Sequence, residues 1–213
     1  TPATWTMEPT YGTNFASSSG WTENTTTASD IDIDTANNKV YLNLTHNSSE
    51  TSVLSRTLPT TSNTAWILRF KVNATSVGTD GSLLVGLSTN ASASDTQQRF
   101  LGFWFKELNS SALRAVTDDN NNAGGLVGGN NTSGYTGTPS SGTDYYVTVV
   151  RDVNDIKVTT RTGSHTGTAV GSGTVITAVD GTATGLNTLK IMNHKCSTGG
   201  AWIGYLYDLE FYN

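Results

Sequence analysis

Residues 202–213 read WIGYLYDLEFYN and form the richest candidate β-strand in a chain of 213 residues. Side chains alternate between the two faces of a strand, so this stretch divides by parity. One face is wholly apolar or aromatic and comprises Ile203, Tyr205, Tyr207, Leu209 and Phe211. The other face is mixed and comprises Trp202, Gly204, Leu206, Asp208, Glu210 and Tyr212. The pattern predicts a core strand inside a sheet.

Alternating segments of the same kind recur upstream. Residues 29–34 and 39–44 alternate on either side of a turn at 35–38, which predicts a β-hairpin. A second hairpin is predicted from residues 145–151 and 156–160. Further strands are expected at 52–58, 66–72, 82–87, 100–106, 113–117, 174–178 and 186–192. No segment shows helical periodicity, so we expect an all-β chain folded as a two-sheet antiparallel β-sandwich of the jelly-roll kind.

The regular strands occupy residues 21–213, which we expect to form a single β-sandwich domain, because sandwiches of about 200–250 residues commonly fold as one unit. Residues 1–20 are irregular and are expected to form an N-terminal arm or edge strand. Such an arm can add a strand to the sheet of a neighbouring molecule. Trp5, Met7 and Tyr11 are therefore the candidate assembly residues, and self-association is expected.

Charged residues make up only 14% of the chain, and the net charge is −5. No basic block is present, which argues against a nucleic-acid partner, because nucleic-acid binding needs clustered Lys and Arg. No run of about 20 apolar residues exists, so no membrane-spanning segment is expected. Cys196 is the only cysteine, which excludes an internal disulfide.

N-glycosylation sequons are spread along the whole chain. Their asparagines are Asn24, Asn43, Asn47, Asn73, Asn90, Asn109, Asn130 and Asn131. A sequon marks a glycan acceptor on the surface of a secreted protein. This distribution favours an extracellular or cell-surface glycoprotein.

The order of the quoted segments also carries a family resemblance. The chain runs NFASSSGWTE (14–23), DIDIDTANNKVYLNL (30–44), TAWILRFKV (64–72), SLLVGLS (82–88), FLGFWF (100–105), DYYVTVVR (144–151) and IGYLYDLEFYN (203–213). This order resembles concanavalin A-like (laminin G-like) jelly rolls, and is particularly similar to single-domain secreted β-proteins of archaea. In such folds the first and last strands typically pair, so the resemblance implies that the closing strand lies beside the N-terminal region.

Many jelly rolls of this type are glycanases, which need a pair of catalytic carboxylates. The related glucanases carry theirs on one strand as Glu-x-Asp-x-(x)-Glu, a spacing that this sequence lacks. Asp208 and Glu210 share one face of a strand and are the only candidate pair of catalytic carboxylates. A solvated outer face of the strand is the simpler interpretation of this pair. Retaining hydrolysis needs two carboxylates about 5–5.5 Å apart. The protein is therefore expected not to be an enzyme.

Two groups of acidic residues could supply oxygen ligands to calcium. Asp30, Asp32 and Asp34 resemble the start of an EF-hand loop, but the required Gly and Glu positions hold Thr35 and Tyr41. These aspartates are better interpreted as the solvent face of a strand. Asp118 and Asp119 open the Asn/Gly-rich loop 118–143 and are the metal candidates, so a structural calcium ion is the one cofactor left open.

Exposed aromatic side chains are further candidates for ligand binding, because an aromatic ring can pack against the apolar face of a sugar. Trp104, on the less regular parity of its strand, and Tyr135, in the long loop, are the candidate sugar-binding residues.

Two non-catalytic functions follow. The first is a structural subunit of a cell-surface assembly such as a filament, sheath or coat, joined through exchange of an N-terminal strand. The alternative is a carbohydrate-binding, lectin-like adhesion module that has glycans as partners.

Overall fold

The computed structural model describes most of the strands and their connections. The described residues are 15–25, 27–44, 52–58, 61–78, 81–89, 99–106, 108, 113–118, 131–132, 137–172, 174–176, 184–193 and 200–213. Within these ranges no helix is long and apolar enough to cross a membrane.

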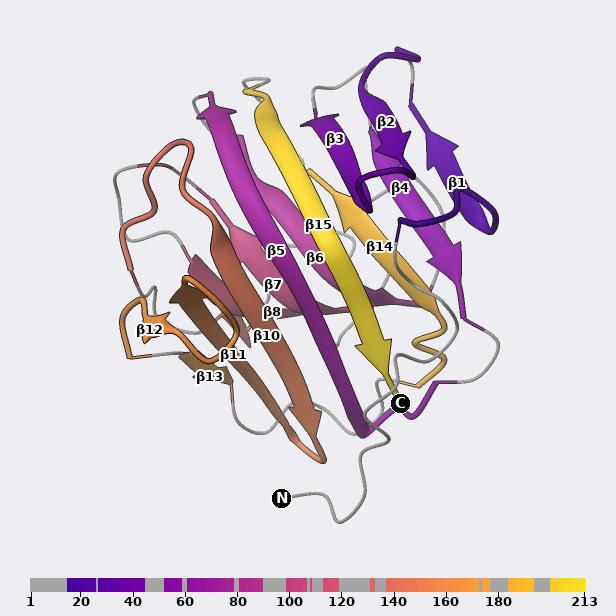
Figure 1. The fold of residues 1–213 in the computed structure, drawn as a ribbon. Helices are drawn as coiled ribbons and strands as arrows, with labels where there is room; N and C mark the ends of the chain where they lie inside the picture. The colour runs from indigo at the N-terminus through magenta and orange to yellow at the C-terminus, as the bar shows by residue number, and fades with distance from the viewer. Residues whose placement is uncertain are drawn as a thin grey trace.

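Two antiparallel sheets pack face to face, as the sequence predicted (Figure 1). The seven-stranded sheet has the order β1-β4-β14-β6-β7-β8-β9. Its strands are β1 (Trp21–Asn24), β4 (Val53–Thr57), β14 (Thr188–Met192), β6 (Leu83–Ser88), β7 (Phe100–Phe105), β8 (Leu113–Asp118) and β9 (Asn131–Thr132).

The eight-stranded sheet has the order β12-β11-β10-β5-β15-β3-β2, and β13 also pairs with β11. Its strands are β12 (Thr168–Ala169), β11 (Asp155–Thr162), β10 (Tyr145–Asp152), β5 (Ala65–Val77), β15 (Trp202–Tyr212), β3 (Lys39–Leu44), β2 (Ile31–Asp34) and β13 (Thr174–Ile176). Both predicted hairpins are confirmed, since β2 pairs with β3 and β10 with β11.

The main core lies between the sheets, where the alternating strands turn their apolar faces. On β3, Val40, Leu42 and Leu44 are fully buried while the residues between them are half-buried. Aromatic rings join the two layers, and the Phe70 and Phe103 rings lie 5.6 Å apart. Burying a large apolar side chain contributes roughly 1.5–3 kcal/mol, so these inward faces dominate the stability of the sandwich.

The closing strand β15 lies in the middle of its sheet, between β3 and β5 (Figure 1). β1 pairs with β4 in the other sheet. Residues 1–14 of the N-terminal region, which was expected to lie beside the closing strand, are outside the described residues, so that expectation stays a prediction. The pairing with β5 runs from Trp202 to Tyr212, whereas the pairing with β3 covers Trp202–Tyr207.

The single apolar face expected for β15 is also wrong. Trp202, Gly204 and Leu206 are buried at the start of the strand, whereas Leu209 and Phe211 are buried at its end. The pairing with β5 shifts register between Tyr207 and Glu210. A β-bulge adds one residue to the strand, so every side chain after it changes face.

Phe15 falls in the segment that was expected to form the N-terminal arm, yet it packs with the sandwich. Phe15 is fully buried in the main core, and its ring stacks on that of Trp21 with centroids 5.1 Å apart. Its backbone N–H donates to Asn38 Oδ1 at 2.7 Å. Phe15 therefore belongs to the core of the sandwich.

Candidate functional site

A row of tyrosines lies on the outer face of the eight-stranded sheet, and we call Tyr41, Tyr205 and Tyr207 the tyrosine face. Register explains the grouping, because Tyr41 on β3 is directly opposite Tyr205 on β15. Their ring centroids lie 5.5 Å apart, and those of Tyr205 and Tyr207 lie 5.9 Å apart. All three side chains are half-buried, so part of each ring is open to a ligand.

The bulge in β15 is what turns two of these tyrosines outward. Asp208 has a left-handed backbone with φ of 49°, a conformation that Asp tolerates better than most residues. Strict alternation from Phe211 back along the strand would have put Tyr205 and Tyr207 in the core. The sequence reasoning missed them for that reason, and the Asp within an aromatic run was the signal that could have revealed the bulge.

Acidic residues of the edge strand β2 border the tyrosine face. Asp32 is opposite Tyr41, and Asp34 is opposite Lys39. An open pocket of about 350 Å³ occupies this corner. Its lining residues are Asp32, Asp34, Lys39, Tyr41 and Tyr205. The pocket therefore joins two aromatic rings to two carboxylates and one ammonium group.

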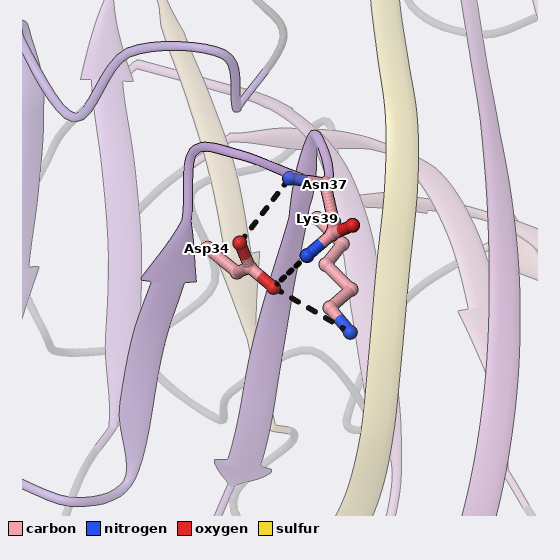
Figure 2. A network of polar contacts seen from close by, with 3 residues as sticks. All are labelled: Asp34, Asn37 and Lys39. Atoms are coloured by element: carbon pink, nitrogen blue, oxygen red, sulfur yellow. Dashed lines mark hydrogen bonds and ion pairs between the residues drawn. The ribbon is translucent and has the colours of Figure 1, made fainter.

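Asp34 is held in place by its own hairpin turn (Figure 2). Asn37 donates its backbone N–H to Asp34 Oδ1 at 3.2 Å and its side-chain Nδ2 to Oδ2 at 2.7 Å. Lys39 Nζ lies 3.6 Å from the same Oδ2. The side-chain hydrogen bond from Asn37 is the main cause that lowers the pKa of Asp34, and Lys39 adds to it. This carboxyl group therefore stays ionised at neutral pH.

Two lysines pack over the tyrosine rings. Lys39 Nζ lies 5.0 Å from the ring centroid of Tyr205, and Lys71 Nζ lies 4.0 Å from that of Tyr207. Each ammonium group also has a carboxylate partner, since Lys71 Nζ lies 3.4 Å from Asp144. Asp32 is exposed, and within the described residues its side-chain carboxylate makes no hydrogen bond. Its carboxylate is thus available to accept hydrogen bonds from a ligand.

Trp104 is not the exposed ring that the sequence suggested, since it is only 4% exposed. It belongs to a second apolar cluster on the outer face of the seven-stranded sheet, and Arg114 lies 3.9 Å from its ring centroid. The other members are Val53, Leu84, Phe100, Val116 and Met192. Tyr135, the second sugar-binding candidate, lies outside the described residues, as do Trp5, Met7 and Tyr11.

The metal candidates remain untested. Asp118 ends β8 opposite Phe100, but its side chain and all of Asp119 lie outside the described part of the chain. Among the residues that the structure does describe, no group of three His, Cys, Asp or Glu side chains could hold a metal ion. Asp30 is buried and accepts hydrogen bonds from Ser52 and Thr25, so it serves the packing of the hairpin.

Three of the sequon asparagines can be placed with their side chains. Asn24 is exposed on the edge strand β1. Asn43 and Asn73 are half-buried, and Asn73 Nδ2 already donates to Asp144 Oδ1 at 2.7 Å. Asn131 lies in β9 without a described side chain, and Asn47, Asn90, Asn109 and Asn130 lie outside the described residues. Asn24 is the best placed of the three for glycan attachment.

Asp208 and Glu210 are both engaged in contacts within the protein. Asp208 accepts a hydrogen bond from Asn38 Nδ2, and Glu210 accepts one from the Tyr212 hydroxyl at 2.7 Å. Burial, together with that bond to Glu210, raises the pKa of Tyr212 to about 12. Neither carboxylate lines the pocket, so the pair is part of the sheet surface.

Comparison with known proteins identifies the fold. No protein-family model matches the chain, and no curated protein matches it by sequence. The seed lectin of Lotus tetragonolobus is similar in structure, with a TM-score of 0.57 and 14% identity over 93% of this chain and 96% of the lectin. Arcelin-5, a lectin-like defense protein of Phaseolus vulgaris, has a TM-score of 0.52 and 11% identity over 93% and 94% of the two chains.

A protein of unknown function from Shewanella oneidensis MR-1 is also similar, with a TM-score of 0.55 and 14% identity over 92% of this chain and 79% of that one. These similarities, together with the two antiparallel sheets, show that the chain has the concanavalin A-like lectin fold. The resemblance found in the sequence is therefore confirmed at the level of the fold.

Proposed function

We propose that the protein is a non-catalytic carbohydrate-binding protein and that its glycan binds in the pocket beside the tyrosine face. The observation that carries this proposal is the pairing of the Tyr41 and Tyr205 rings with the carboxylates of Asp32 and Asp34 in one open pocket. Binding sites for small ligands typically combine an aromatic surface with a few placed polar groups.

Each part of the pocket suits one part of a sugar. The ring of a tyrosine packs on the apolar C–H face of a pyranose. The Asp32 carboxylate can accept hydrogen bonds from sugar hydroxyls, and bonds to an ionised acceptor are roughly twice as strong as neutral ones. The similar fold of a seed lectin supports a glycan as the ligand.

The charge state of the pocket argues for binding without hydrolysis. A glycosidase needs one carboxylic acid with a raised pKa as its proton donor. Asn37 and Lys39 lower the pKa of Asp34 instead, which removes it as an acid at neutral pH. Asp208 and Glu210 lie outside the pocket lining and are bonded to Asn38 and Tyr212.

A glycan array followed by calorimetry on the best ligand tests the proposal. Y41A and Y205A should each weaken binding by about tenfold or more, which corresponds to roughly 1.4 kcal/mol. Y146A is the matched control, since Tyr146 lies on the same sheet outside the pocket and packs against His165. Folded protein that binds no glycan, or equal losses in Y146A, would rule the proposal out.

We also propose an extracellular or cell-surface location for this glycan-binding protein. The spread of sequons and the exposure of Asn24 support it. Mass spectrometry of glycopeptides from the native source should find a glycan on Asn24. The structural-subunit hypothesis depends on residues 1–11, which lie outside the described residues, and it stays a prediction.

A further inference from the structure

The pocket beside the tyrosine face carries a net negative charge. Its lining includes the carboxylates of Asp32 and Asp34 and the ammonium group of Lys39, which gives a net charge of −1. Charges of one sign that line a hollow in the protein surface raise the local concentration of ligands of the opposite sign. The pocket therefore favours a ligand with a positive charge over one with a negative charge.

One half of the pocket already holds an ammonium group, which belongs to the protein itself. Lys39 Nζ lies 3.6 Å from Asp34 Oδ2 and 5.0 Å from the ring centroid of Tyr205 (Figure 2 shows the ion pair). An ammonium group within about 6 Å of the face of an aromatic ring is attracted by its π-electrons. A carboxylate and a tyrosine ring of this corner can thus hold an ammonium group between them.

The other half of the pocket repeats the carboxylate and the rings without a cation of the protein. Asp32 lies two residues before Asp34 and therefore leaves β2 on the same face. The strand register places Asp32 opposite Tyr41, and Tyr41 opposite Tyr205, with the two ring centroids 5.5 Å apart. Among the described residues, no Lys or Arg forms an ion pair with Asp32. An ammonium group from a ligand would complete this half.

A third carboxylate adds to the negative potential at Asp32. Glu23 lies on β1, the edge strand of the other sheet, and its side chain is exposed. Partial desolvation raises the pKa of Glu23, and the neighbouring Asp32 carboxylate raises it further. Two like charges within electrostatic reach disfavour each other's ionised form. A cation that enters beside Asp32 would relieve this repulsion.

We propose that the ligand of this pocket is an amino sugar, whose protonated amine binds the Asp32 carboxylate beside the Tyr41 ring. This inference rests on the proposed glycan-binding function and names the class of sugar for the same pocket. A free amine gives a sugar a positive charge, whereas a hydroxyl or an acetamide leaves it neutral and a uronic acid makes it negative. The Tyr205 ring remains available to the apolar face of the pyranose.

Matched sugars test the proposal. Glucosamine, galactosamine and mannosamine are each compared with their N-acetyl derivative and with the hexose that carries a hydroxyl instead, and glucuronic acid is the anionic probe. Affinities are measured by NMR titration of the full chain at a mildly acidic pH, where the amines are protonated, and at constant ionic strength. We expect at least one amino sugar to bind about fivefold or more tightly than both neutral counterparts. No such preference for any amine, or tighter binding of glucuronic acid than of glucose, would overturn the proposal.

A charge-neutral variant locates the preference. D32N keeps the shape of the side chain and removes its charge, so the ratio of amino-sugar affinity to hexose affinity should fall close to one. D152N is the control, because it removes the same charge from a residue that lies outside the pocket lining and pairs with Lys157 at 3.6 Å. It should keep the ratio of the wild type. A ratio that is unchanged in D32N, or lost equally in D152N, would overturn the assignment to Asp32.

Removing the internal ammonium group should act in the opposite direction. K39M leaves Asp34 held by its two hydrogen bonds from Asn37 and makes the pocket more negative, so the ratio should rise. A ratio that falls in K39M would contradict the proposal.

The outcomes also separate this inference from the function on which it rests. Neutral hexoses that bind in a Tyr41-dependent manner, with no preference for an amine, would overturn the amino-sugar assignment and leave the proposed glycan-binding function standing. Folded protein that binds neither amino sugars nor neutral sugars would overturn both.

Discussion

Asn38 and Asp208 lie 170 positions apart in the chain and bond to each other twice. Asn38 Nδ2 donates to Asp208 Oδ1 at 3.1 Å, and the Asp208 backbone N–H donates to Asn38 O at 3.2 Å. Both residues have left-handed backbones, with φ of 48° and 49°. The turn of the β2–β3 hairpin therefore fastens the bulge of β15, which turns Tyr205 and Tyr207 toward the surface.

Replacing Asn38 should destabilise the protein in two separable steps. N38G keeps the left-handed backbone and the backbone bond from the Asp208 N–H, but it loses the side-chain bonds to Asp208 Oδ1 and from the Phe15 N–H, at a cost of roughly 1–2 kcal/mol. N38A adds the strain of a left-handed alanine, about 1 kcal/mol more. Urea unfolding measures both, and an N38A variant as stable as N38G would contradict the role of the backbone conformation.

Gly204 should not tolerate a side chain. A Cβ at this position would collide with the Asn73 carbonyl oxygen and lie 2.8 Å from the Trp202 indole. Overpacking of this kind costs about 1–3 kcal/mol, so G204A should lower the free energy of unfolding by that amount. S76A is the control, because Ser76 is exposed opposite Ile203 and should change stability by less than about 0.5 kcal/mol. Equal stability of G204A and the wild type would refute the close approach.

The turn at Val153 offers a stabilising substitution. Val153 is 59% exposed and has φ of 51°, a conformation that is unfavourable for a β-branched residue. V153G should remove this strain and raise the free energy of unfolding by about 1 kcal/mol, because glycine adopts positive φ freely. Chemical denaturation checks the sign, and a destabilised V153G would mean that the valine side chain makes a contact worth more than the strain.

His165 should make stability depend on pH. Burial lowers its pKa, as does the nearby Arg69, while Glu210 and Asp208 oppose the shift. The folded state thus favours the neutral imidazole, whose Nδ1 lies 3.2 Å from Thr148 Oγ1. Its contribution is fully present above the ordinary pKa of about 6.5 and is lost as the pH falls through the lower folded value.

An H165Q variant checks that expectation. The wild type should lose stability more steeply than H165Q as the pH falls from 7 toward 5, and NMR titration should place the His165 pKa below 6.5. An imidazole that titrates at or above 6.5 in the folded protein would show that the carboxylates of Glu210 and Asp208 outweigh burial.

Local alternation was enough to predict most of the strands. In the β2–β3 hairpin, the residues expected to point inward, such as Val40 and Leu42, are buried as predicted. The alternation of side chains between the two faces can be read from the sequence of one strand alone. Turn residues such as Asn38 mark the ends of that strand. The sheet partners of β15 could not be predicted in this way, because pairing depends on segments far apart in the chain.

The candidate site was the least predictable part. Trp104 looked accessible from parity, but every residue of β7 is buried, so an aromatic residue on either parity of this strand is buried. The parity of residues 202–213 predicted that Tyr205 points into the core, but the bulge in β15 places its side chain on the outer face of the sheet. The lining of the pocket joins β2 and β3 to a strand from the other end of the chain, and no local pattern contains that juxtaposition.

The sequence by itself determined the all-β class, the two hairpins and the inward faces of the regular strands, because each of these follows from the short-range alternation of apolar and polar side chains. Only the tertiary structure decided which strands became neighbours, where β15 bulged and which tyrosines reached the surface. The physical reason is that a one-residue bulge stabilised by Asn38, a residue 170 positions away from Asp208, reverses every side chain beyond it.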